Sequence, residues 1–149
     1  MRQHKGFTLV ELVVVVMILG ILAAVAAPKL LNTSSAATEN GIKQTLSVVR
    51  DAIERFAAEN GGQLPGGASA TEATFTAAIA PYLRGGVLPI CPVASENNEV
   101  KVTGGTDPIV GEADSGTQKS WHYCSGSGQF ICNSTTATKG DPSVTFDML

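Results

Sequence analysis

The chain has few aromatic, charged, histidine and cysteine residues for its length. Of its 149 residues, 5% are aromatic and 15% are charged, and there are two histidines and three cysteines. The C-x-x-C and H-x-x-x-H spacings that are typical of zinc sites are missing, as is a glycine-rich loop of the phosphate-binding form. These absences argue against a zinc site and against a nucleotide-binding loop.

Catalytic side chains are scarce as well. His4 lies in the basic N-terminal segment, and His122 lies in a predicted strand with no obvious nucleophile beside it. We therefore expect no enzymatic activity and no required cofactor.

The balance of charge is acidic. The net charge is -3, and residues 29–149 carry eight basic against twelve acidic side chains. Nucleic-acid-binding surfaces need clustered Lys and Arg to neutralise phosphates, so nucleic acid is an unlikely partner.

One long apolar run does occur, at residues 7–27. It holds 21 residues with a single charge, and as a helix it would span the ~30 Å hydrocarbon core of a bilayer. Arg2 and Lys5 precede it, which predicts a cytoplasmic N-terminus and an exported remainder. The one charge, Glu11, would cost about 2.5–3.5 kcal/mol in the membrane and therefore needs a partner.

Two simpler interpretations of the run leave features unexplained. Residues 24–26 have the small-x-small form of a signal-peptidase site, but the run is longer than an ordinary signal, Glu11 interrupts it and Pro28 follows the cut. A plain membrane anchor explains the length and the basic flank but leaves Glu11 unpaired.

Residues 6–12 read GFTLVEL, and this stretch resembles the N-terminus of type IV prepilins and type II secretion pseudopilins. The resemblance implies that prepilin peptidase removes a leader at residues 1–6 by cutting between Gly6 and Phe7. It also implies that the new amine of Phe7 is methylated, and that Glu11 is the family's assembly glutamate. Gly20 and Pro28 sit where the family tends to have helix-loosening residues, which implies that residues 20–28 unwind in the fibre.

Physical chemistry gives this pattern a reason. Cleavage creates an ammonium at Phe7. In a stack of subunits this ammonium can meet the Glu11 carboxylate of a neighbour, so that neither charge is left unpaired in the apolar core. A partner within the subunit, four residues away along the helix, is the alternative. We expect one helix over 7–60, with a bend near Pro28.

The exported part, residues 28–149, is predicted to begin with an amphipathic helix at 28–60. Its apolar residues recur at spacings of three and four and predict one core-facing side. These residues are Ile42, Leu46, Val49, Ile53 and Phe56. The opposite side is expected to be solvated or to face other subunits, and carries Lys43, Arg50, Asp51, Glu54 and Arg55. Asn60-Gly61-Gly62 predicts the helix end.

A short helix at 69–84, capped by Thr71 or Ser69 and distorted at Pro81, is expected next. Residues 98–149 then predict a small antiparallel sheet with loops, in which Tyr123 faces Phe130 and Trp121 faces Cys132. Strands are expected at 99–103, 120–124, 129–133 and 143–147. The fold class is α+β, and the resemblance implies a type IV pilin-like spine helix packed on this sheet.

The three cysteines leave the disulfide pairing open. In the predicted hairpin, Cys124 and Cys132 are about three residues out of register, roughly 10 Å apart and too far for a bridge. Cys91 is therefore the favoured partner of one of them, and a Cys124–Cys132 bridge or no bridge are the alternatives.

Metal binding has little support in the pattern. The resembled major pseudopilins often bind calcium in a C-terminal loop, and Asp107, Glu112 and Asp114 lie in the Gly-rich loop 104–117. The loop lacks a recognisable calcium pattern, so we expect solvated carboxylates there, with calcium as the alternative.

The sequence thus predicts a structural filament subunit, a single-pass inner-membrane protein with a periplasmic C-terminal domain before assembly. The resemblance implies partners in the form of further copies, related minor subunits, prepilin peptidase and an inner-membrane assembly platform. The favoured version is a major-type pseudopilin of a type II secretion system, and the alternative is a type IV pilin for adhesion or motility. From another class, a minor pilin or an anchored protein that binds DNA or another ligand remains an alternative.

Overall fold

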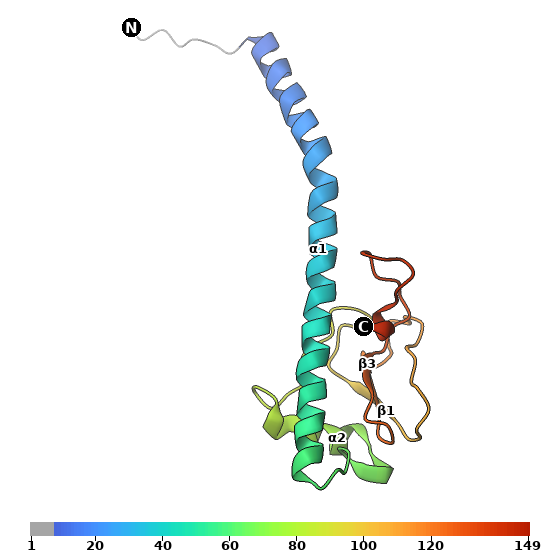
Figure 1. Ribbon diagram of the computed structural model, residues 1–149. Coiled ribbons are helices and arrows are strands. Elements are labelled where there is room, and N and C mark those ends of the chain that lie inside the picture. The colour runs from blue at the N-terminus through green and yellow to red at the C-terminus, as the bar shows by residue number, and fades with distance from the viewer. Residues whose placement is uncertain (1–7) are drawn as a thin grey trace.

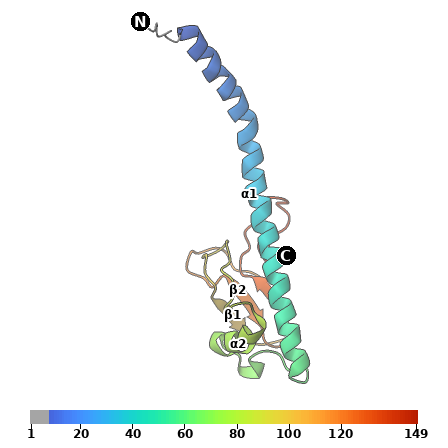
Figure 2. The ribbon, with the colours of Figure 1, turned by 90° about the vertical axis from the view of Figure 1, so that its left-hand side faces the viewer.

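The computed structural model describes the backbone of residues 8–149 and the side chains of residues 8–26 and 35–149. One long helix, α1 (Leu9–Glu59), runs the length of the molecule, and the rest of the chain packs beside its C-terminal half (Figure 1). The N-terminal half of α1 extends beyond this domain and curves gently (Figure 2). Gly20 and Pro28 both lie within the helix, which is continuous through the segment that the resemblance marks for unwinding.

The C-terminal end of α1 lies where the sequence predicts it, at Asn60-Gly61-Gly62. Asn60 forms the C-cap, and its backbone N–H donates to the carbonyl of Phe56. Gly61 and Gly62 follow with φ values of 66° and 87°, a left-handed conformation that glycine adopts without steric cost. The chain can therefore reverse direction immediately after the helix.

The core lies between the C-terminal half of α1, a second helix and a sheet. Ile42, Leu46 and Val49 of α1 are at most 1% exposed. The second helix, α2 (Glu72–Ile79), is capped by Thr71 and continues as a 3-10 turn (Ala80–Tyr82) that contains Pro81. Its Phe75 is buried and stacks on Tyr123 of the sheet with ring centroids 4.1 Å apart.

The sheet has three strands in the order β1 (Val100–Thr103), β2 (Trp121–Cys124), β3 (Phe130–Cys132). The predicted hairpin register is confirmed, because Trp121 pairs with Cys132 and Tyr123 pairs with Phe130. The sheet is mixed rather than antiparallel, since β1 runs parallel to β2. Residues 104–120 between these strands are numerous enough to carry the chain back to the starting end, as a parallel connection requires.

The prediction of an edge strand at residues 143–147 is wrong. This segment makes one isolated bridge, Ala137 with Thr145, and then turns into a 3-10 helix (Phe146–Met148). The turn carries the Phe146 side chain into the core, where it is 8% exposed. The 3-10 backbone of residues 146–148 replaces the extended backbone that an edge strand requires.

Candidate functional site

The first turn of α1 holds Glu11 in a capping box with Thr8. The backbone N–H and the hydroxyl of Thr8 each donate to Glu11 Oε2 at 2.8 Å, and Thr8 Oγ1 accepts the Glu11 N–H at 3.3 Å. The carboxylate also lies at the helix N-terminus, where the helix dipole favours negative charge. Glu11 therefore has a local partner three residues away; Gly6 and Phe7 lie outside the described residues.

Thr8 is a site residue that the sequence analysis missed. The signal was present, because Thr8 and Glu11 have the T-x-x-E spacing of a capping box immediately before an apolar helix. Within the described part of the chain, both hydrogen bonds to the Glu11 carboxylate end on Oε2, so Oε1 is available to a second donor.

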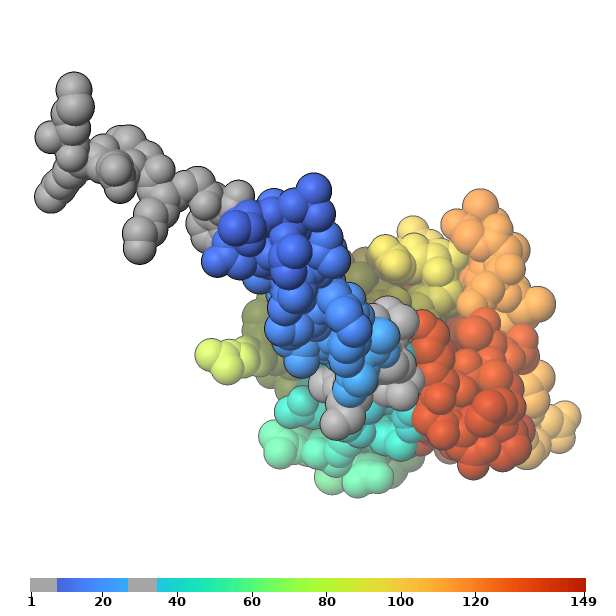
Figure 3. Space-filling view, turned by 90° about the horizontal axis from the view of Figure 1, so that it is seen from above, coloured from blue at the N-terminus to red at the C-terminus, as the bar shows by residue number. Residues whose placement is uncertain are grey.

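Glu11 lies in the first turn of the apolar half of α1. Leu9–Ala26 is long and apolar enough to cross a membrane, and its large apolar side chains are 47–79% exposed. Seen from above, these residues are nearest the viewer (Figure 3), and the two side views show that they extend beyond the domain (Figures 1 and 2). At Gly20, an added Cβ would meet no atom within 4 Å. The burial that these side chains need must therefore come from outside the chain.

The cysteines fall on two faces of the sheet. The sulfurs of Cys91 and Cys132 are 3.6 Å apart, and both residues are fully buried. Cys124 points to the other face, where its thiol donates to the carbonyl of Gly105 at 3.1 Å. All three are free thiols in the structure, so the predicted bridge is not formed there, although Cys91 and Cys132 are brought together.

One carboxylate of loop 104–117, that of Glu112, is held by hydrogen bonds from outside the loop. Glu112 was expected to be solvated, but Lys101 Nζ donates to its Oε1 at 2.7 Å and Asn133 Nδ2 donates to its Oε2 at 2.9 Å. These bonds, with that from Lys101 the stronger, hold the pKa of Glu112 below its usual value. Among residues 8–26 and 35–149, no three acidic, histidine or cysteine side chains gather to hold a metal ion.

His122 is held beside the same loop. Its Nε2 lies 3.1 Å from Thr103 Oγ1 and its Nδ1 lies 3.2 Å from the carbonyl of Val110. Burial of the ring lowers the pKa of His122, so the neutral form is favoured in the folded protein. These bonds give the histidine a structural role in fixing loop 104–117 to the sheet.

Comparison with known families bears on the N-terminal segment. The model of the prokaryotic N-terminal methylation motif matches residues 1–27, which include Gly6, Phe7 and the capping box. This segment therefore carries a prokaryotic N-terminal methylation motif and is similar to the N-terminus of type IV prepilins and pseudopilins. Residues 1–27 are called the prepilin segment below. This segment contains both the methylation motif and the exposed apolar half of α1.

Similar proteins come from both secretion systems and pili. The chain is 37% identical over 59 residues to a type II secretion system core protein G of Pseudomonas aeruginosa, covering 40% of this chain and 42% of that protein. It is 40% identical over 50 residues to a type IV narrow pilus major component of Thermus thermophilus, covering 34% and 43%. A fimbrial protein of Eikenella corrodens is 39% identical over 61 residues, covering 41% and 38%. The matches thus span about two fifths of these relatives, and no solved structure matches the chain.

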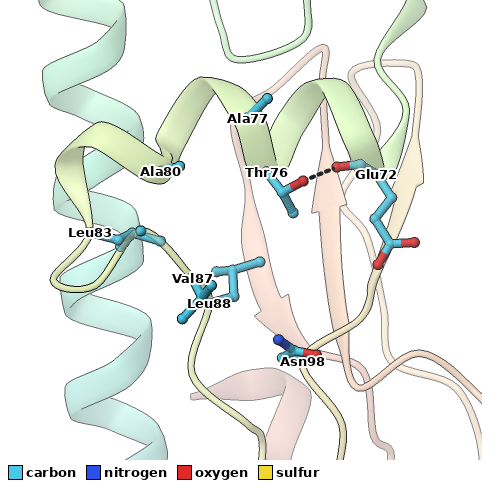
Figure 4. A pocket seen from close by; sticks show the side chains of 9 residues that line it. Glu72, Thr76, Ala77, Ala80, Leu83, Val87, Leu88 and Asn98 are labelled. Atoms are coloured by element: carbon cyan, nitrogen blue, oxygen red, sulfur yellow. Dashed lines mark hydrogen bonds between the residues drawn. The ribbon is translucent and has the colours of Figure 1, made fainter.

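Far from the prepilin segment, a hollow of about 500 Å³ opens between α2 and residues 83–98 (Figure 4). Small and apolar side chains form most of its wall, and Glu72 supplies its charge. Both oxygens of Glu72 are engaged, Oε1 by the N–H of Val100 at 2.8 Å and Oε2 by Lys119. Glu72 therefore ties α2 to β1 and to the segment before β2.

Proposed function

We propose that the chain is a structural subunit of a helical filament. It is stored in the inner membrane through the prepilin segment, cut by prepilin peptidase between Gly6 and Phe7, and methylated on Phe7. The observation that carries this proposal is the methylation motif at residues 1–27 on a helix whose apolar side chains are exposed. Lipid covers those side chains before assembly, and neighbouring subunits cover them afterwards.

The capping box gives Glu11 hydrogen-bond donors both in the membrane and in the assembled filament. Cleavage after Gly6 leaves the amide of Thr8 intact, so Thr8 still holds Oε2 of Glu11 in the processed chain. Oε1 then accepts from the Phe7 ammonium of a neighbouring subunit. An ion pair in an apolar surrounding requires good geometry and further hydrogen bonds, and the Thr8 donors supply them. The pair sets the axial register of the filament.

Within this function, the favoured version is a major-type pseudopilin of a type II secretion system. The relative from Pseudomonas aeruginosa supports it, as does the order of a spine helix, a short helix and a small sheet. The partners are then further copies, minor subunits and an inner-membrane assembly platform. A type IV pilin for adhesion or motility is the second candidate, which the Thermus thermophilus relative favours.

Processing is tested by co-expression with a prepilin peptidase, followed by intact-mass measurement of the membrane-extracted chain. The expected product lacks residues 1–6 and carries one added methyl group on Phe7. An inactive peptidase is the matched control and should leave the full mass. A product lacking residues 1–26, or no cleavage with the active enzyme, contradicts the proposal.

The two versions are separated by deleting the gene in its own host. A pseudopilin predicts that an exported protein disappears from the medium while surface filaments remain. A pilin predicts the loss of surface filaments, adhesion or motility with secretion unchanged. Re-expression of the intact gene must restore whichever property is lost.

A further inference from the structure

Two parts of the chain that are 41 residues apart bring Cys91 and Cys132 into contact inside the core. Cys132 lies on β3 directly opposite Trp121 of β2. The indole N–H of Trp121 donates to the carbonyl of Pro89 at 2.9 Å, and the N–H of Cys91 donates to the carbonyl of Asn97 at 3.0 Å. The segment that carries Cys91 is therefore joined to β2 through Pro89 and to Asn97 within its own loop, and it places Cys91 against Cys132.

The third cysteine is excluded from this contact by strand geometry. Successive side chains on a strand point to opposite faces, so Cys124 of β2 faces away from Trp121 and Tyr123. Its thiol is bonded to Gly105 on that other face. The pair in contact is thus unambiguous.

We propose that Cys91 and Cys132 form a disulfide bond as the domain folds after export, and that Cys124 remains a thiol. The sulfurs, now 3.6 Å apart, need to approach by about 1.5 Å to reach the ~2.05 Å of a disulfide. The inference rests on the proposed function for one condition only, namely that the domain reaches an oxidising compartment.

The oxidant is a disulfide, either of a protein thiol oxidase or of oxidised glutathione. The Cys91 thiolate attacks it and expels one thiol, and the Cys132 thiolate then attacks Cys91 Sγ in the mixed disulfide and expels the second. The two cysteines lose two protons and two electrons, and the oxidant gains them as two thiols. The hydrogen bond from Cys132 lowers the pKa of Cys91, in keeping with Cys91 as the first nucleophile.

The bond closes a loop that contains β1 and β2. Cross-linking residues this far apart restricts the unfolded chain, and for a domain of this size the expected rise in Tm is on the order of 10 °C. Loss of the bond should therefore be visible as a lower Tm in the presence of a reductant.

The test uses the full chain, extracted from membranes in mild detergent with free thiols alkylated during lysis. Trypsin leaves Cys124 and Cys132 in one peptide, residues 120–139, so chymotrypsin is needed to cut between them after Phe130. The expected result is a peptide linked through Cys91 and Cys132, an alkylated Cys124, and a Tm that falls on reduction. Cys124→Ser is the matched control and should keep both the link and the fall in Tm.

A second arm refolds the reduced chain with oxidised glutathione, which removes the dependence on export. A Cys91–Cys132 link in this arm but none in the cell supports the pairing and overturns its formation after export. Alkylation of all three cysteines in both arms, or a link to Cys124, overturns it. Leader processing is measured on the same samples, so a linked but uncut chain overturns the filament proposal and leaves the disulfide standing.

Discussion

The two halves of α1 are one helix in two different surroundings. Leu19, in the first half, is 59% exposed, whereas Leu46, in the second half, is 1% exposed. Packing within the chain therefore explains the second half, but the first half depends on lipid or on other subunits. The proposed assembly surface and the core for folding are therefore separate, so a substitution that damages one should leave the other intact.

The largest effect is expected from Glu11→Ala in the first half. In the proposed pair, removal of the Glu11 carboxylate leaves the Phe7 ammonium of the neighbouring subunit uncompensated in an apolar surrounding, which strongly disfavours assembly. Sheared filament fractions should therefore contain no detectable subunit, while leader processing and the Tm of the domain stay unchanged. Normal filaments from this variant would refute the role given to Glu11.

The reverse damage is expected from Leu46→Ala in the second half. A buried Leu→Ala change costs about 2–5 kcal/mol through lost burial and the cavity left behind. Urea unfolding should show this loss in the domain, while leader processing is unchanged. Leu19→Ala is the matched control, of the same residue type on the same helix, and should leave the unfolding midpoint unmoved. A comparable loss in both variants would mean that the two halves are not independent.

Local patterns predicted much of this arrangement. The apolar spacing after residue 41 and the glycine pair after Asn60 predicted the core face and the end of α1, because both depend on neighbouring residues only. The hairpin register was equally readable, since a short turn fixes which residues of β2 and β3 face each other.

Hydrogen bonds between distant parts of the chain could not be predicted from the sequence. Arg50 was expected to be solvated or to face other subunits, but its Nε and Nη2 donate to the carbonyl of Phe130 at 3.1 and 2.9 Å. The bonds of Glu112 and the parallel pairing of β1 depend in the same way on how loop 104–117 crosses the sheet. Nothing in the local sequence specifies that path. The capping box at Thr8 was local and should have been recognised.

A smaller effect, confined to the domain, is expected from pH acting on His122. Its pKa is lowered in the folded state by burial, so between that value and about 6.5 the unfolded chain binds more protons. Stability should therefore fall as pH drops from 7 towards 5, by about 1.4 kcal/mol for each unit of pKa difference. Urea unfolding at several pH values measures this slope.

His122→Asn should remove the slope over that range, whatever it does to stability at neutral pH. The carboxylates Glu72 and Glu112 also have lowered pKa values, but their protonation destabilises the fold only at lower pH, below their unfolded values. An unchanged slope in the variant would assign the effect to another group.

The smallest effects are expected from replacing two glycines, one in each half of α1, by alanine. At both Gly20 and Gly41, an added Cβ meets no atom within 4 Å, so alanine fits at either position and favours the helix by up to about 1 kcal/mol. Gly41→Ala should raise the Tm of the domain by a few degrees and leave assembly unchanged. Gly20→Ala should leave that Tm unchanged, because residue 20 lies beyond the domain, and should lower filament yield if residues 20–28 must unwind in the fibre. Filament yield that is normal in both variants would show that the helix stays wound on assembly, and would remove the helix-loosening role from Gly20.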